Sequence, residues 1–402
     1  MTRSVSVHRS PREANASDRW VGVGTSRDSD ARRAGAEAAA EALGSRTAKL
    51  LVVFCSDAYD LDVLLSQIND HSGGAALIGC STAGEISTGG PTDASVVVIA
   101  LGGEGFSVQT AVAERASTRL REAGAEVAGI VAGVEDRGHR ALLLLTDGLA
   151  GDQQEIVRGA YGVLGAETPL VGGCAGDDLK MSKTYQLHGD RVYCDAVVGA
   201  VVASDAPLGI GVRHGWRKVG EPMVVAKSAE NRVFVLDDRP ALDVYLERLE
   251  APPEAYDNAA AFTRFALTHP LGLSRRTGEE HVRFVAEADF EQRALVCIAE
   301  VPQGGMAWFM QGDSASVLEA TDAACRDALA PLDGRPPLGM IAFDCIARRG
   351  VLGDSGIGRE VARIAGHASG APVAGFYTYG EIARTQGISG FHNQTLVVLA
   401  LS

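Results

Sequence analysis

The sequence predicts an α/β protein with two related α/β domains, built from repeated strand–helix–glycine-loop–strand modules with mixed sheets. Three observations support this class. Short apolar strands alternate with amphipathic helices, a glycine-rich loop recurs three times, and 48 of the 402 residues are glycine without the Gly-X-Y period of collagen. Hydrophobic residues make up 46% of the chain and charged residues 22%, as is typical of globular proteins. We therefore expect a folded, loop-rich chain long enough for two or three domains.

The chain divides into a leader and two domains. Residues 1–19 are polar and of mixed charge, and we interpret them as a disordered leader. We expect an amino-terminal domain over residues 20–236 and a carboxy-terminal domain over residues 237–402. The boundary precedes Asp237-Asp-Arg-Pro240, which is expected to supply an N-cap and a helix-starting proline. An Ala/Glu-rich surface helix is predicted over residues 31–43.

Each of the three modules begins with an apolar strand, predicted at residues 50–55, 141–145 and 338–343. An amphipathic helix follows each strand. The glycine loops then read Leu77-Ile-Gly-Cys-Ser-Thr-Ala-Gly-Glu-Ile86, Leu170-Val-Gly-Gly-Cys-Ala-Gly-Asp-Asp-Leu179 and Val373-Ala-Gly-Phe-Tyr-Thr-Tyr-Gly-Glu-Ile382. The first and third loops share G-x4-G-E, whereas the second is one residue shorter and is expected to place Asp177 where the others have Glu. Closing strands are predicted at residues 95–101, 196–203 and 395–401.

A different region separates the second module from the third. Strands are predicted there at residues 223–226, 233–236, 282–288, 295–301 and 306–311. Two helices frame these strands, one around Leu242 and Tyr245 and the other over residues 314–329.

Charge and cysteine usage exclude several classes of protein. The net charge of −14 and the pI near 5.1 disfavour a general binder of nucleic acid or anionic membranes. The apolar runs are far shorter than the ~18 residues of a membrane helix, so no membrane insertion is expected. Seven scattered cysteines without a CxxC pair support neither a zinc site nor a disulfide framework. A cytoplasmic protein with reduced thiols is the expectation.

The third glycine loop is the candidate ligand site. A phosphate loop would need Lys where Glu85 or Glu381 follows the last glycine, so nucleotide binding is disfavoured. Aromatic walls with a few hydrogen-bonding groups are instead typical of small-molecule pockets. An aromatic core plug with a capping Glu is the alternative interpretation. The candidate ligand-binding residues are Arg348, Cys345, Phe376, Tyr377, Tyr379, Glu381, His392 and Asn393.

Cysteine and histidine residues suggest two other kinds of site, a catalytic thiol and a metal or haem ligand. Cys80, Cys174 or Cys345 would be the nucleophile of a thiol-dependent enzyme, but no basic partner is adjacent in the sequence. His214 or His392 could ligate a metal or haem, although no HxxxH or HExxH pair is present. We therefore predict no catalytic residue, no metal site and no enzymatic activity.

Together these motifs resemble the FIST family, from about Lys49 to the C-terminus. The amino-terminal half is similar through Ile78-Gly-Cys-Ser-Thr-Ala-Gly-Glu85, Thr146-Asp-Gly148, Val171-Gly-Gly-Cys-Ala-Gly-Asp177 and the stretch from Gly215 to Val225. The carboxy-terminal half is similar through Pro240-Ala241, Cys345 with Arg348, Gly375-Phe-Tyr-Thr-Tyr-Gly-Glu381 and Phe391-His-Asn393.

The resemblance implies a cytoplasmic sensory protein that binds a small ligand, of which an amino acid is one example. It also implies signalling to a separately encoded partner, such as a histidine kinase or a cyclase, because no output domain is expected in this chain. A haem-based nitric-oxide sensor acting with a histidine kinase is the alternative that the family implies. A thiol-dependent enzyme is the third hypothesis.

Overall fold

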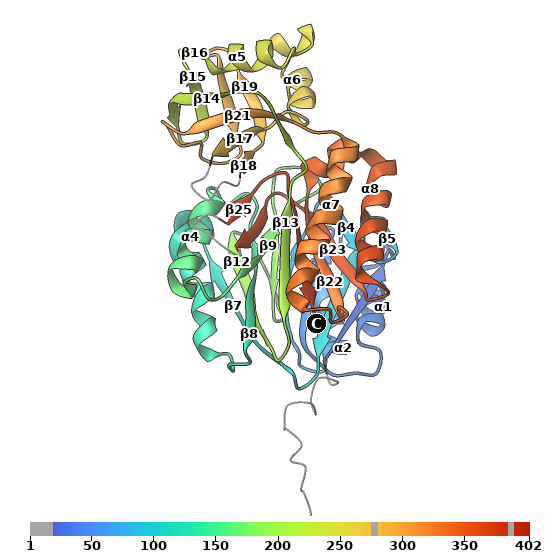
Figure 1. Ribbon diagram of the computed structural model, residues 1–402. Helices are drawn as coiled ribbons and strands as arrows, with labels where there is room; N and C mark the ends of the chain where they lie inside the picture. The colour runs from blue at the N-terminus through green and yellow to red at the C-terminus, as the bar shows by residue number, and fades with distance from the viewer. Residues whose placement is uncertain (1–18, 275–279, 385–389) are drawn as a thin grey trace, which may run out of the picture.

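The computed structural model describes residues 19–274, 280–384 and 390–402, so all but the last residue of the expected leader lies outside the described part. Its main body contains three repeats of one element order, β-α-β-α-β-β-β-β, and a smaller domain is inserted into the third (Figure 1). The first repeat consists of β1 (Trp20–Ser26), α1 (Ala31–Leu43), β2 (Ala48–Cys55), α2 (Leu61–Ser72), β3 (Ala76–Ser81), β4 (Glu85–Ser87), β5 (Gly90–Thr92) and β6 (Val96–Gly102).

The second and third repeats follow the same order. The second consists of β7 (Phe106–Glu114), α3 (Leu120–Ala128), β8 (His139–Thr146), α4 (Gln153–Leu164), β9 (Leu170–Cys174), β10 (Gln186–His188), β11 (Arg191–Tyr193) and β12 (Ala196–Ser204). The third consists of β13 (Leu208–Arg213), α7 (Ser314–Leu329), β22 (Gly339–Cys345), α8 (Ile346–Ala368), β23 (Val373–Thr378), β24 (Glu381–Arg384), β25 (Phe391–His392) and β26 (Leu396–Leu401). Short 3-10 turns lie at Ala116–Thr118, Gly129–Gly133, Pro253–Tyr256 and Ala330–Leu332.

Polar caps and glycines set the ends of several helices. Asp60 accepts a hydrogen bond from the Val63 amide at the start of α2, and Gly73 ends that helix in the left-handed region with φ of 62°. Asp313 forms a capping box with Ser316 at the start of α7. Helix α8 is interrupted at Gly353, whose φ of 63° is left-handed.

The three repeats exchange strands in a cycle. Hairpin β4–β5 of the first repeat extends the sheet of the third, because β4 pairs with β23. Hairpin β24–β25 of the third repeat extends the sheet of the second through β9, and β10–β11 of the second extends the sheet of the first through β3. Each six-stranded sheet contains one parallel pair, such as β2 with β3, among antiparallel neighbours. The sheets are therefore mixed, and each is completed by another repeat.

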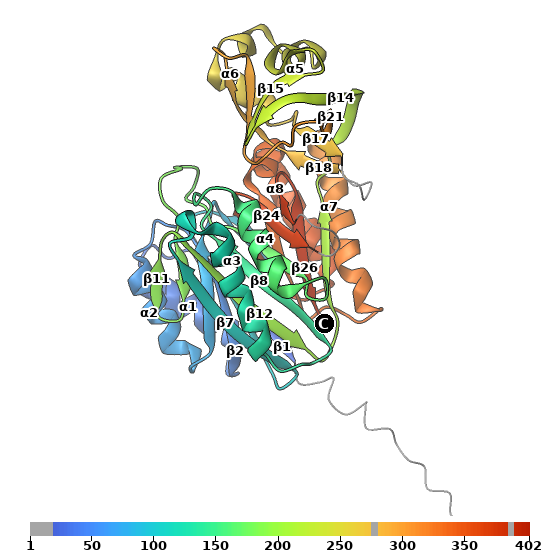
Figure 2. The ribbon, with the colours of Figure 1, turned by 90° about the vertical axis from the view of Figure 1, so that its left-hand side faces the viewer.

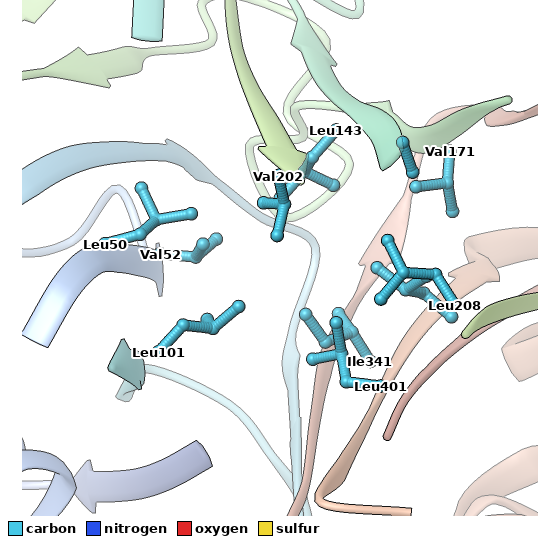
Figure 3. Close-up of a pocket in the computed structure, with 11 residues that line it drawn as sticks. Leu50, Val52, Leu101, Leu143, Val171, Val202, Leu208, Ile341 and Leu401 are labelled. Atoms are coloured by element: carbon cyan, nitrogen blue, oxygen red, sulfur yellow. The ribbon is translucent and has the colours of Figure 1, made fainter. Parts of the chain in front are cut away.

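The three sheets face one another and the helices lie outside them (Figures 1 and 2). One apolar cluster joins the inner faces and includes Phe54, Phe343 and Phe376. The ring centroids of Phe54 and Phe376 are 4.6 Å apart, and Phe343 packs edge-on against both. Aliphatic side chains from all three repeats, including Leu143 and Ile341, surround a cavity of about 10 Å³ there (Figure 3). This space is too small for an organic ligand.

The inserted domain follows β13 and stands above the third repeat (Figure 1). Its strands form one sheet, and helices α5 and α6 pack on the apolar cluster of that sheet. Its elements are β14 (Arg217–Ala229), β15 (Arg232–Leu236), β16 (Arg239–Pro240), α5 (Ala241–Arg248), α6 (Ala259–Ala266), β17 (Leu271–Ser274), β18 (Glu280–Arg283), β19 (Val285–Asp289), β20 (Ala294–Cys297) and β21 (Met306–Gln311).

The predicted fold class is confirmed: repeated strand–helix–glycine-loop–strand modules form mixed sheets. The predicted helices at 31–43 and 314–329 match α1 and α7. The expected start of the helix at Pro240 is wrong, because Pro240 pairs in β16 and α5 begins at Ala241 without a side-chain cap. The expected division at residues 236 and 237 falls between the paired strands β15 and β16. In the described residues, no helix combines the length and the apolarity that crossing a membrane requires.

A glycine substitution tests the close strand approach in the third repeat. A Cβ at Gly375 would lie 2.0 Å from the Ala342 carbonyl oxygen, so we expect Gly375→Ala to lower the free energy of unfolding by about 1–3 kcal/mol. The matched control is Gly366→Ala at an exposed position of helix α8, where nothing lies within 4 Å and a gain of up to about 1 kcal/mol is expected. Urea unfolding measures both variants, and equal midpoints would contradict the close approach.

Candidate functional site at the junction of the glycine loops

The three glycine loops meet through one repeated backbone hydrogen bond. The Tyr377 amide donates to the Gly84 carbonyl at 2.8 Å, and the Cys174 amide donates to the Gly380 carbonyl at 2.8 Å. The equivalent bond of the first loop runs from the Ser81 amide to the Tyr185 carbonyl, at 2.9 Å. In each case, the glycine loop of one repeat is hydrogen-bonded to the backbone of another repeat. We call this region the loop junction.

Two buried glutamates anchor the junction. Glu85 accepts hydrogen bonds from the Thr82 hydroxyl and from the Ser95 amide and hydroxyl. Glu381 accepts from the Thr378 hydroxyl at 2.6 Å and from the Thr395 amide and hydroxyl at 3.0 and 2.8 Å. Both side chains are fully buried. Burial raises the pKa of each carboxyl to about 7, although these hydrogen bonds act in the opposite direction.

The second repeat places Gln186, not Asp177, where the other repeats have glutamate. Gln186 pairs in β10 opposite Cys80, as Glu85 does opposite Phe376 and Glu381 opposite Gly173. The expected match of Asp177 to the glutamates is therefore wrong. The second repeat has additional residues between its glycine loop and the exchanged strand. The position equivalent to the glutamates therefore lies outside the glycine-loop motif in the sequence.

Asp177 instead organises the segment that follows it. Its carboxylate accepts hydrogen bonds from the amides of Met181, Ser182 and Lys183, at 2.7–3.0 Å, and from the Tyr379 hydroxyl. Burial opposes ionisation, but Tyr379 and these amides hold the pKa of Asp177 below its usual value. Tyr379, which is 9% exposed, therefore links the third glycine loop to an exposed segment of the second repeat.

Arg348 lies in a buried cluster of charges at the carboxyl end of β22. Its guanidinium bonds Asp344 at 2.7 Å and also contacts Glu360 and the Thr321 hydroxyl. It further donates to the His214 carbonyl at 2.9 Å, just before the inserted domain. Burial and the neighbouring Glu360 raise the pKa of Asp344 well above its usual value, whereas the Arg348 guanidinium acts in the opposite direction.

Asp344 and Glu360 are not among the residues predicted from the sequence. Asp344 is the polar residue in the apolar strand Gly339–Cys345 and lies four residues before Arg348, which is a signal that the sequence contained. Glu360 lies twelve residues after Arg348, beyond the interruption of α8 at Gly353, so its contact depends on the tertiary fold.

Besides Asp344 Oδ2 and Glu360 Oε2 within the cluster, three buried polar groups beside it have no hydrogen-bond partner among the described residues. They are the Tyr377 hydroxyl, Asn393 Oδ1 and Gln394 Oε1. Tyr377, the last residue but one of β23, pairs with Asp344 of β22. Residues 393–394 lie one residue before β26, which also pairs with β22. The three groups therefore belong to adjoining segments at one end of the third sheet. Unpaired buried polar groups are destabilising, so this end of the sheet is suited to a ligand or water.

The other predicted site residues lie in different surroundings. Phe376 is fully buried in the cluster between the sheets, which matches the core-plug interpretation. Cys345 is 5% exposed at the end of β22. His392 is partly buried, with Nε2 2.9 Å from the Ala383 carbonyl oxygen. Glu381 has both oxygens engaged at the junction, so the structure does not place all eight residues around one open pocket.

The cysteines of the thiol hypothesis are buried. Burial raises the pKa of Cys80, Cys174 and Cys345 far above the usual thiol value, which keeps these side chains protonated and weakly nucleophilic. Cys194 is exposed, in contrast to the other six.

The two histidines of the haem hypothesis both interact with the protein. His214 Nδ1 accepts the Trp216 amide at 2.9 Å, and His392 contacts the Ala383 carbonyl oxygen. The cavity between the sheets is lined by aliphatic residues and contains neither imidazole. Among the described residues, this cavity therefore offers no imidazole to a haem iron. Within that same part of the chain, no three His, Cys, Asp or Glu side chains are grouped to hold a metal ion.

The fold and the junction define a three-repeat α/β protein with cyclic strand exchange and one inserted domain. The FIST N domain matches residues 49–239 and the FIST C domain matches residues 241–384, so the chain belongs to the FIST family.

Two curated relatives match nearly the whole chain, and a third matches a smaller part of it. Two proteins of Mycobacterium tuberculosis, Uncharacterized protein MT0656 (strain CDC 1551 / Oshkosh) and Uncharacterized protein Rv0628c (strain ATCC 25618 / H37Rv), are each 26% identical over 392 residues, covering 93% of this chain and 97% of their own length. Uncharacterized protein MJ1623 of Methanocaldococcus jannaschii is 27% identical over 161 residues, covering 38% of this chain and 31% of its own length.

Thiol labelling tests the burial of the cysteines. We expect one thiol to react rapidly with a water-soluble disulfide reagent near neutral pH, because Cys194 is exposed and the other six react only after opening of the fold. The Cys194→Ser variant should lose the rapid phase. A rapid phase that survives in this variant would identify a second reactive thiol and contradict the burial.

Two tyrosines of one motif provide a matched pair. Tyr379→Phe removes the bonds to Asp177 and to the Leu179 amide, and should lower the free energy of unfolding by about 1.5–3 kcal/mol. Tyr377→Phe removes a buried hydroxyl without a partner among the described residues and should leave stability unchanged or slightly higher. Denaturant unfolding compares them, and equal losses would contradict this assignment.

Proposed function

We propose that the protein is a sensory module that binds a small polar ligand and signals to a separate protein. The proposed site lies at the carboxyl ends of the parallel strands β22 and β23 in the third sheet. Membership of the FIST family supports the general class, since FIST domains are associated with signal transduction and small-ligand binding. The proposal includes no catalytic step. A separately encoded histidine kinase or cyclase is the proposed partner.

The proposal depends mainly on the unsatisfied polar groups at that end of the sheet. The Tyr377 hydroxyl, Asn393 Oδ1 and Gln394 Oε1 are buried without partners in the described structure. Two of the three are obligate acceptors, so they suit a ligand rich in N–H donors. An ammonium group meets this requirement. We propose an α-amino acid as the ligand.

The same segments hold the inserted domain. Gln394 Nε2 donates to the Leu267 carbonyl at 2.9 Å, and the Gln394 carbonyl accepts the Trp216 indole N–H at 3.0 Å. His281 of β18 contacts the Phe391 carbonyl oxygen at 2.5 Å. A ligand that bonds Gln394 therefore acts where the inserted domain meets the third repeat. Binding sites commonly lie between domains, and small displacements there move whole domains.

A thermal-shift screen with the twenty amino acids tests the proposal. A ligand at 100 times its Kd should stabilise the protein by about 2.7 kcal/mol. Tyr377→Phe should weaken this shift at least tenfold in ligand concentration, whereas Tyr256→Phe in the inserted domain should retain it. The absence of a shift with every amino acid, or equal responses of the two variants, would contradict the proposed ligand and site.

A further inference from the structure

The three anchoring positions of the loop junction carry two ionisable side chains and one that cannot ionise. Glu85, Gln186 and Glu381 are equivalent by strand pairing, and all three are fully buried. A shared position with nearly the same bonds allows the chemistry of the glutamine to be compared directly with that of the glutamates.

Gln186 shows which end of the side chain must donate. Its Oε1 accepts the Ala196 amide at 3.1 Å, and its Nε2 donates to the Thr184 hydroxyl at 3.2 Å. The Thr184 hydroxyl in turn donates to Asp147 Oδ1 at 2.8 Å, so it can only accept from Gln186. The second repeat therefore needs a donor at this position.

The glutamates have the same arrangement. Glu85 Oε2 accepts the Ser95 amide at 3.2 Å, as Gln186 Oε1 accepts the Ala196 amide, and Oε1 faces the Thr82 hydroxyl as Nε2 faces Thr184. In the third repeat, Glu381 Oε2 accepts the Thr395 amide and Oε1 faces the Thr378 hydroxyl. When Oε1 carries a proton and the Thr82 or Thr378 hydroxyl turns to accept it instead of donating, each glutamate has the bonding of the glutamine.

We propose that Glu85 and Glu381 each carry a proton in the folded protein and that the loop junction loosens when these protons leave. Proton binding at the two sites is a property separate from the proposed ligand. Loss of a proton leaves a fully buried anion. Because Glu85 begins β4 and Glu381 begins β24, two of the three exchanged hairpins depend on these protons.

The neighbours of Glu85 do not supply a compensating positive charge. Its titratable neighbours are Cys55 on β2, Tyr59 after that strand, Cys80 on β3 and Asp178 of the second repeat. Asp178 adds negative charge, which disfavours the ionised form.

On the far side of Gly84, the guanidinium of Arg349 approaches the loop but is already paired. Its two terminal nitrogens bond Asp93, and one also donates to the Ala83 carbonyl. This pair is neutral overall, so it does not hold Glu85 in the ionised form.

The neighbours of Glu381 are of the same kind. Cys345 of β22 donates a weak hydrogen bond to it, and Cys174 of β9 lies nearby. His392 lies opposite Glu381 in the β24–β25 ladder, and its Nε2 contacts the Ala383 carbonyl oxygen. Burial is the largest influence on Glu381, as on Glu85, and raises the pKa of both to about 7.

The sign of the pH dependence follows from the raised pKa. A carboxyl with a folded pKa near 7 and an unfolded pKa near 4.5 stabilises the fold fully below about pH 4.5. This contribution is lost as the pH rises through 7. Between pH 5 and pH 8, each group should therefore increase the unfolding constant on the order of 10- to 100-fold relative to a neutral side chain.

Denaturant unfolding between pH 5 and pH 8 tests the inference on the full chain. Each of the variants Glu85→Gln and Glu381→Gln should remove the loss of stability that its own glutamate causes between pH 5 and pH 8. The double variant should remove both contributions. The reciprocal variant Gln186→Glu places a third carboxyl at the junction and should add a loss of similar size. Equal pH dependence of the wild-type protein and the double glutamine variant would overturn the inference.

Infrared difference spectroscopy provides a readout that does not depend on stability. Raising the pH from 6 to 9 should remove the contribution of Glu85 and Glu381 to the carbonyl-stretch band of neutral carboxylic acids in the wild-type protein. Each glutamine variant should reduce this difference band. A band unchanged in both variants would show that the two carboxyls are already ionised and would overturn the inference, even if a variant were less stable.

Discussion

The exchange of hairpins among the three repeats is the constraint on which the rest of the structure depends. An exposed sheet edge presents unpaired amide and carbonyl groups, and each repeat covers such an edge of another. Because the exchange closes in a cycle, removing one hairpin exposes the sheet of a neighbouring repeat. The glycine loops lie where the exchanged chains cross, and their close packing follows from this requirement. At Gly375, for example, a side chain would overlap the Ala342 carbonyl oxygen.

The repeats share a backbone plan but differ in their polar chemistry. At equivalent strand positions, the first repeat has Cys55, the second Thr146 and the third Asp344. The third repeat adds Arg348 and Glu360, and it alone of the three receives the inserted domain. Charge, unsatisfied polar groups and a second domain thus coincide in one repeat. A common framework with one specialised copy separates the part that maintains the fold from the part suited to binding.

Much of the fold could be predicted from the sequence, because local signals determine it. The alternation of strands and helices, the recurring glycine loops and the boundaries of α1 and α7 are all readable from periodicity and from residues such as Gly44. The candidate site was predicted only in part. Tyr377 and Asn393 have unsatisfied polar atoms, but Phe376 packs in the core and Glu381 is a junction anchor. A motif indicates which residues lie near each other, but it does not determine which way each side chain points.

By itself, the sequence determined the repeated module, the mixed α/β class, the acidic surface and the family. These properties depend on composition and on spacings of a few residues. Only the tertiary structure decided that the modules exchange strands, that Gln186 and not Asp177 is equivalent to the glutamates, and that Glu360 reaches Arg348. Each of these depends on contacts between residues far apart in the chain or on extra residues that shift the register. The physical reason is that strand pairing and burial are decided by the whole assembled core, whereas helix periodicity, capping and turns are decided locally.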